Sequence, residues 1–178
     1  MERSVYESPL GTLHLAADEK ALCGLWLEGQ KYFAAGLTGN ETQNPQNPAL
    51  RLACDWLDAY FAGKRPDVSA LPLAPRGSEF RQQVWKLLGE IPYGEVTTYG
   101  ELAKRLAAMQ GRKTMSAQAV GGAVGHNPIS VIIPCHRVVG ADGSLTGYAG
   151  GIQKKLWLLR HEGADRETLY LPTKGTAL

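Results

Sequence analysis

Three side chains able to take part in chemistry stand in a row: Cys135, His136 and Arg137. They follow the apolar run 131–133 and Pro134, and this pattern predicts a buried strand that ends at a conformationally fixed proline. A thiol attacks as its thiolate, and an unperturbed cysteine of pKa about 8.5 is only slightly ionised at neutral pH. The thiol needs a base or a positive field, and His136 and Arg137 offer both, so Cys135 is the candidate nucleophile.

Two segments downstream of the thiol extend this prediction. The glycine-rich stretch 140–151, "GADGSLTGYAGG", predicts a flexible loop over a pocket. The stretch 157–163, "WLLRHEG", predicts the end of a helix, where Glu162 could hold the imidazole of His136 in one tautomer. For a single Cys-His pair, the alternative interpretation is that the two residues are neighbours by chance and have no joint chemical role. The series of strand end, proline, thiol, imidazole and glycine loop favours a catalytic arrangement.

Upstream of the thiol, two short helices are predicted. The first is opened by Ser78 as N-cap, and the second, about 99–108, begins with the capping-box pair Thr98 and Glu101 and is broken by Gly111. A further helical stretch, "SAQAVGGAVG", follows and makes a helix-turn-helix candidate. Its side chains are almost all small. Tight packing against another helix explains this, and so does close approach to the DNA minor groove, which is roughly 6 Å wide.

The N-terminal part of the sequence predicts strands as well as a helix. The stretch 11–29 alternates and predicts two strands around the turn 18–20, and a polar loop is expected over 38–48. A helix is predicted over about 48–61. A proline-rich connector follows and divides the chain into an α/β domain, 1–74, and a mostly helical domain, 75–178.

Composition narrows the functional classes. The three cysteines form no CxxC pair, which argues against a disulfide framework and a structural zinc site, and Cys23 and Cys54 are expected in the core. The absence of a long apolar run or secretion signal predicts a cytoplasmic location. Residues 1–78 carry 7 Lys and Arg against 9 Asp and Glu, whereas 79–178 carry 12 against 8, so a polyanion should prefer the C-terminal part.

The stretches "PYGEVTTYGELA", "IPCHRVVG" and "GYAGG…WLLRHEG" together resemble the O6-alkylguanine-DNA alkyltransferases, also called methylated-DNA–protein-cysteine methyltransferases. The resemblance is strong over 79–163 and only architectural over 1–78. It implies a ribonuclease-H-like sheet in the first domain and a helix-turn-helix in the second. It also implies single-turnover transfer of an alkyl group from O6-alkylguanine, with O4-alkylthymine as a further candidate, to Cys135. A monomer is expected to bind double-stranded DNA, with no cofactor and no metal.

The resemblance assigns roles position by position. Cys135 would accept the alkyl group, His136 would take its proton through a water, and Glu162 would support the histidine. Tyr99 would help to rotate the nucleotide out of the helix, and Asn127 would lie in the hinge before the active-site strand. The positions expected to contact DNA or the flipped base are Gln118, Ala119, Gly122, Arg137, Tyr148, Ala149 and Gly150.

The chain departs from the family pattern in the helix-turn-helix. Relatives usually place an arginine before "AVGG" that fills the space left by the flipped base, and this chain has Gln118. Glutamine lacks the charge and the flat guanidinium. The connection "AAMQGRKTMS" is also longer than the family pattern, and Arg112 or Lys113 is a candidate substitute.

Two other functions fit parts of the sequence. A lesion-binding protein of the same fold would transfer nothing, but such relatives replace the cysteine, which this chain keeps. A cysteine hydrolase using Cys135 and His136 would turn over without DNA, but hydrolytic cysteines usually have their base distant in sequence. Mass analysis after exposure to alkylated DNA separates these functions from alkyl transfer.

Overall fold

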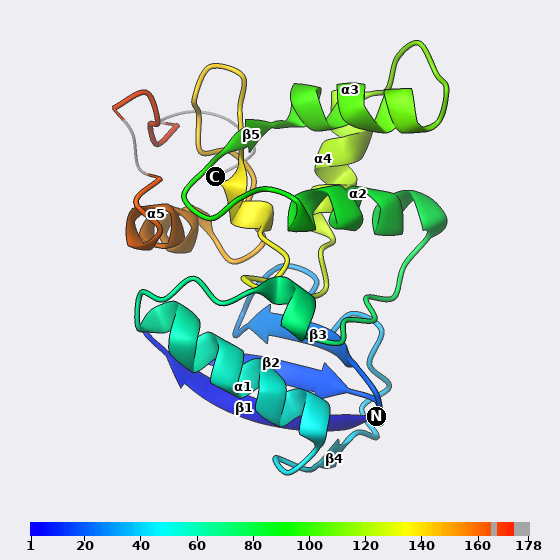
Figure 1. Cartoon of the computed structure of the whole chain (residues 1–178), viewed down its shortest axis with the longest axis vertical. Helices are drawn as coiled ribbons and strands as arrows, with labels where there is room; N and C mark the ends of the chain where they lie inside the picture. Colours follow the sequence, from blue (N-terminus) through cyan, green and yellow to red (C-terminus); the bar gives the residue numbers. More distant parts are fainter. Residues whose placement is uncertain (165–166, 173–178) are drawn as a thin grey trace. The chain divides into compact units, whose positions relative to one another are not determined.

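The computed structural model describes residues 1–164 and 167–172. These residues form two compact units (Figure 1), which are described separately. The first contains 1–76 together with 128–132, and the second contains 77–127 and the residues from 133 onward. The predicted division at 74/75 placed 128–132 in the second domain, whereas this short segment packs with the first. No helix in the described part of the chain is long and apolar enough to cross a membrane.

The first unit is built on a four-stranded sheet of order β3-β2-β1-β4. Strands β1 (Glu2–Ser8), β2 (Gly11–Ala17) and β3 (Leu22–Leu27) are antiparallel neighbours, and the short β4 (Thr42–Gln43) is parallel to β1. The two predicted strands and their turn are confirmed. The predicted loop over 38–48 is wrong at β4, because its two exposed residues carry no apolar alternation that would reveal a strand.

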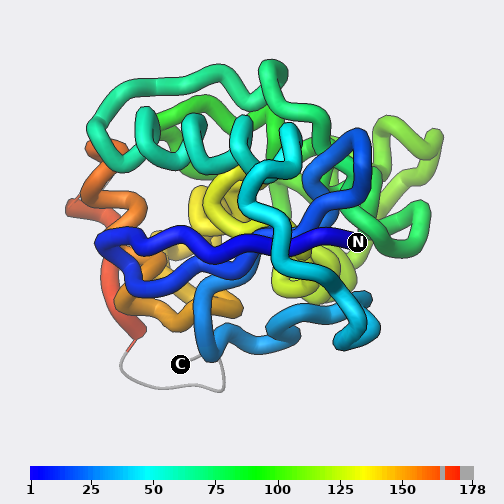
Figure 2. Tube along the Cα trace, turned by 90° about the horizontal axis from the view of Figure 1, so that it is seen from below, coloured from blue at the N-terminus to red at the C-terminus, as the bar shows by residue number. Residues whose placement is uncertain are grey.

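Helix α1 (Pro48–Phe61) covers one face of this sheet, and in Figure 2 it lies on the opposite side of β1 from the segment after β3. The Asn47 side chain accepts hydrogen bonds from the N–H groups of Ala49 and Leu50, which satisfies the first turn. Among its aromatic residues, Trp56 and Tyr60 are buried. Cys54, expected in the core, is only half-buried, because the packed face of the helix is centred away from it. Cys23 is buried as predicted. A 3₁₀ turn, η1 (Val68–Ala70), lies in the connector.

The second unit begins with three helices, α2 (Glu79–Gly89), α3 (Tyr99–Met109) and α4 (Ala117–Gly125). The predicted caps are present: Ser78 caps α2, and Thr98 and Glu101 form a reciprocal capping box on α3. Helix α4 packs against both α2 and α3, and the Trp85 indole donates to the Ala123 carbonyl at 2.9 Å. The helix-turn-helix expected from the sequence is therefore α3, a long turn and α4.

The chain between α4 and the thiol differs from the expected strand. Residues 130–133 form turns, and Cys135–Arg137 form a 3₁₀ turn, η2, followed by the two-residue strand β6 (Val138–Val139). Val131 has a φ of 70°, a left-handed conformation that a β-branched residue rarely adopts. A strand ending at Pro134 was the wrong prediction, because an apolar run only reports burial and these residues are buried within a turn.

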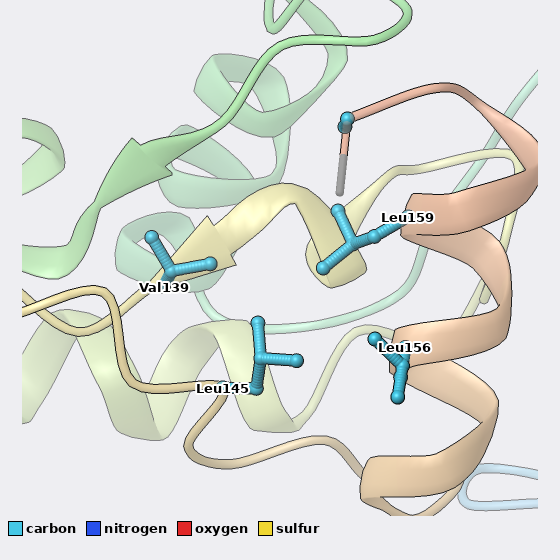
Figure 3. Packing of buried hydrophobic residues seen from close by; sticks show 5 residues of the cluster. Val139, Leu145, Leu156 and Leu159 are labelled. Atoms are coloured by element: carbon cyan, nitrogen blue, oxygen red, sulfur yellow. The ribbon is translucent and has the colours of Figure 1, made fainter. Parts of the chain in front are cut away.

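Strand β6 connects the thiol to the rest of the second unit. It pairs in parallel with β5 (Thr97–Thr98), which directly precedes α3. Figure 3 shows the apolar packing on its other side, where Val139 and Leu145 meet Leu156 and Leu159 of α5 (Ile152–His161). The cluster fixes α5 against the segment that carries Cys135, so Glu162 at the end of α5 reaches the same site.

Candidate active site

The Cys135 thiol is enclosed, with the residue 4% exposed at the start of η2. The Asn127 side-chain amide donates to Sγ at 3.1 Å and to the Ile133 carbonyl at 2.8 Å. Burial raises the pKa of Cys135, while the Asn127 hydrogen bond and the positive charge of Lys155 oppose this rise. The resting sulfur is therefore a thiol, and the site holds groups that favour the thiolate once the proton has a place to go.

His136 lies next in the 3₁₀ turn and is fully buried. Its Nε2 is 2.7 Å from Oε1 of Glu162. Burial lowers the pKa of His136, so the ring is neutral at pH 7 despite the opposing hydrogen bond to the carboxylate. Because an ionised carboxylate only accepts, Nε2 carries the hydrogen and Nδ1 carries the lone pair. Nδ1 has no hydrogen-bond partner within the described residues, which leaves it as the basic atom of the site.

Glu162 is held by charged donors. The Arg137 Nε donates to Oε2 at 2.8 Å and its second terminal nitrogen donates to Oε1 at 3.0 Å. Burial alone would raise the pKa of Glu162, but the hydrogen bonds and charges of His136 and Arg137 outweigh it and hold the pKa well below its usual range. The carboxylate is thus ionised over the whole physiological range, and it orients His136.

Arg137 requires a correction. It was predicted to contact DNA, yet it is 7% exposed, and besides Glu162 it donates to the Ile91 carbonyl at 2.6 Å. Its guanidinium also lies 5.7 Å from the centre of the Tyr93 ring. These contacts hold the guanidinium inside the second unit, where it serves as a partner of Glu162. The sequence shows only that an arginine follows His136, and its direction depends on the unforeseen 3₁₀ turn.

The glycine-rich loop carries the next predicted group. Tyr148, Ala149 and Gly150 lie in this loop at intermediate exposure. The Tyr148 hydroxyl oxygen is buried without a partner within the described residues. Burial, and the charges of Cys135 and Glu162, raise its pKa well above the usual value. It is therefore a protonated hydrogen-bond donor close to the nucleophile.

Tyr99 joins the loop to the helix-turn-helix. Its hydroxyl donates to the Thr146 carbonyl at 3.0 Å, and a Cβ at Gly121 of α4 would stand only 3.5 Å from its ring. Burial raises the pKa of Tyr99 to about 12, with a further contribution from the charge of Cys135. In this conformation Tyr99 is a structural link among loop, α3 and α4.

The remaining predicted positions lie on α4. Gln118, Ala119 and Gly122 are all exposed on this helix. A Cβ at Gly122 would meet nothing within 4 Å, so its small size is not demanded by packing. By contrast, Val120, Ala123 and Val124 of the same helix are buried. Ala119 and Gly122 leave a low surface on this side of the helix, from which Gln118 is the one longer side chain to project.

Lys155 is a site residue that the sequence analysis missed. It is fully buried, and its Nζ donates to the Val138 carbonyl at 2.5 Å and the Thr146 carbonyl at 2.9 Å. Burial lowers its pKa to about 8, although the charge of Cys135 opposes this. The available signal was spacing: Lys155 lies seven residues before Glu162, on the same helical face.

These features together define a class: a protein that couples a buried cysteine nucleophile, with an imidazole–carboxylate pair, to a helix-turn-helix. Profiles of two domains match the chain. The ribonuclease-like domain of 6-O-methylguanine DNA methyltransferase matches residues 1–75, and the DNA binding domain of 6-O-methylguanine DNA methyltransferase matches residues 79–164.

Individual relatives agree with these profiles. A methylated-DNA–protein-cysteine methyltransferase of Methanosarcina acetivorans is 42% identical over 92% of this chain and 99% of its own. One of Mycolicibacterium paratuberculosis is 44% identical over 91% and 92% of the two chains. The crystal structure of Mycobacterium tuberculosis OGT in complex with DNA superposes with a TM-score of 0.79 at 42% identity, covering 92% of this chain and 94% of that one. The chain belongs to the 6-O-methylguanine DNA methyltransferase family.

Proposed function

We propose that this protein repairs DNA by moving the alkyl group of O6-alkylguanine onto Sγ of Cys135, once per molecule. The observation that carries the proposal is the hydrogen-bonded Glu162–His136 pair beside the buried thiol. O4-alkylthymine is a second candidate substrate, because it offers the same alkyl–oxygen bond. We assign the activity to a monomer in the cytoplasm.

The reaction begins with the proton of the thiol. His136 accepts it at Nδ1, directly or through a water, and the imidazolium that results is stabilised by Glu162. The negative sulfur keeps the Asn127 hydrogen bond and lies in the field of Lys155. These two groups lower the free energy of the thiolate at the moment it attacks, which is where stabilisation accelerates a reaction.

The transfer itself is a displacement at the alkyl carbon. The Sγ–C bond forms while the C–O6 bond breaks, and the electron pair of that bond passes to the guanine. The Tyr148 hydroxyl is the candidate donor to this developing charge, because it is buried, protonated and unpartnered within the described residues. The proton held by His136 balances the charge of the released guanine. A thioether has no easy route back to a thiol, so one molecule acts once.

The target atom must be brought to the sulfur. Because O6 lies inside stacked DNA, the nucleotide has to leave the helix before attack, and this costs a few kcal/mol. The small exposed residues Ala119 and Gly122 on α4 suit close approach to a minor groove, with Gln118 as the longer side chain beside them. Ala149 and Gly150 are the loop positions proposed to contact the flipped base, and Tyr99 the residue that assists its rotation.

Intact-protein and peptide mass spectrometry tests the proposal. Incubation with an oligonucleotide containing O6-methylguanine should add one methyl group to the peptide that bears Cys135 and to no other. The Cys135→Ala variant should remain unlabelled while still binding the oligonucleotide. Label on Cys23 or Cys54, or methanol released in amounts exceeding the protein, would refute transfer to Cys135. An unlabelled wild-type protein that binds the lesion would establish the lesion-binding alternative.

A further inference from the structure

The long turn between α3 and α4 forms one wall of a groove of about 450 Å³. Three cationic side chains line it: Lys104 of α3, and Arg112 and Lys113 of the turn. The other lining side chains are Thr114 and small or apolar residues. Of the described residues that line the groove, none is acidic.

These cations are exposed to solvent. The turn is nevertheless ordered by its main chain, because Gly111 takes a φ of 63° and the Arg112 N–H donates to the Ala107 carbonyl at 2.9 Å. Lys104 interacts with Glu101 of α3, but the pKa of Glu101 is lowered mainly by hydrogen bonds from Thr97 and Thr98 and only lastly by the charge of Lys104. The groove therefore presents a net positive surface on a fixed backbone.

The neighbouring helix explains why such a surface is needed. Helix α4 contains no charged residue. Phosphate neutralisation by Lys and Arg supplies a large part of DNA affinity. In a helix-turn-helix the second helix enters the groove while the first crosses the sugar-phosphate backbone. Lys104 lies on that first helix, and Arg112 and Lys113 line the same surface.

We propose that Lys104, Arg112 and Lys113 form a phosphate-binding groove that grips the DNA backbone beside the groove entered by α4. The proposal rests on the proposed function only in taking DNA as the partner. In this proposal the long turn positions the protein on the DNA backbone and does not insert a side chain between the bases. Ala117 of α4 lines this groove whereas Gln118 does not, so the groove lies beside the position of Gln118 and is shared with α3.

The test is the salt dependence of binding to undamaged duplex DNA, measured by fluorescence anisotropy. The logarithm of the association constant falls with the logarithm of salt by about 0.9 per phosphate contact. The variant Arg112→Gln/Lys113→Gln should thus reduce the slope by about 1.8. Between about 50 and 200 mM salt, the wild type should lose about twelvefold more affinity than this variant. Adding Lys104→Gln should reduce the slope by about a further 0.9.

The matched control is Lys64→Gln/Arg65→Gln. It also removes one lysine and one arginine charge, from two consecutive exposed residues in the first unit. Its slope should equal that of the wild type. A wild-type slope in the Arg112/Lys113 variant, or an equal reduction in the control, would overturn the proposal. Thermal melting establishes that each variant is folded. If the variants change the salt slope as expected but the wild type transfers no methyl group to Cys135, the proposed function is refuted while the phosphate-binding groove is supported.

Discussion

Glu162 is the partner of both His136 and Arg137, and this leads to a prediction in which one pair of variants differs in stability but not in transfer rate. Its carboxylate, with no exposed side-chain surface, receives both His136 and the buried Arg137. Glu162→Gln keeps the shape but removes the charge. Arg137 is then a buried cation without a counter-ion, and His136 loses the group that fixes its hydrogen on Nε2.

The expected loss of stability follows from the burial of the pair. Removing one partner of a buried ion pair costs about 3–5 kcal/mol, because the remaining charge is left uncompensated. With a urea m value of about 2 kcal/mol/M, the unfolding midpoint should fall by about 2 M. Replacing both partners removes this penalty, so Arg137→Met/Glu162→Gln should recover most of the loss.

The rate should behave differently. Both variants lack the carboxylate that orients and supports His136, so both should transfer the alkyl group about 100-fold more slowly than the wild type. Adding His136→Ala to Glu162→Gln should reduce the rate little further, because the two residues act as a unit. The assays are urea unfolding followed by circular dichroism, and single-turnover transfer from free O6-benzylguanine below the unfolding transition.

Acid supplies an internal check. The folded pKa of Glu162 is depressed, so its contribution to stability is fully present above the ordinary value of 4.5 and is lost as the pH falls toward the lowered value. The stability difference between wild type and Glu162→Gln should therefore shrink below pH 4.5. A double variant that regained both stability and rate would refute the relay, since Glu162 would then serve only as the counter-ion of Arg137.

Two further predictions concern other parts of the site. Gln118→Arg should speed repair of a lesion in duplex DNA and leave the reaction of free O6-benzylguanine unchanged. The reason is that a side chain filling the space left in the base stack offsets only the cost of unstacking, which free O6-benzylguanine does not incur. Unaltered or slower duplex repair would place Gln118 outside the base stack. Since burial lowers the pKa of His136 below 6.5, any loss of transfer rate on acidification should have its midpoint below pH 6.5. A pH–rate profile with free O6-benzylguanine measures this, and a loss of rate toward acid with a midpoint at pH 6.5 or higher would contradict a neutral resting imidazole.

Local signals in the sequence predicted the regular elements well. The capping residues Ser78, Thr98 and Glu101 begin their helices where expected, because a side chain that satisfies free N–H groups acts within three residues. The period of α1 predicted where the helix runs but not which side of it is buried: Trp56 and Tyr60 are buried, whereas Cys54, expected in the core, is only half-buried. That choice depends on the sheet it packs against.

The site was predictable in its residue types and less so in its geometry. His136 contacts Glu162 as the sequence predicted, and Cys135 is buried directly before His136 in the same 3₁₀ turn. The direction of Arg137 and the burial of Lys155 were not predictable. Both depend on how η2 and α5 face one another across the apolar cluster, which no local pattern in either segment records.

The short segment 128–132 has a consequence for how this chain could exchange domains with a relative. The Leu25 N–H of β3 donates to the Pro128 carbonyl, and the Ser130 N–H donates back to the Leu25 carbonyl. These five residues therefore belong to the sheet unit, although in sequence they lie between α4 and Cys135. A chimaera joined at the proline-rich connector would pair the β3 of one parent with the 128–132 of the other. Exchange of domains at the proline-rich connector alone would therefore disrupt this pairing. A folded chimaera should take residues 1–76 and 128–132 from the same parent.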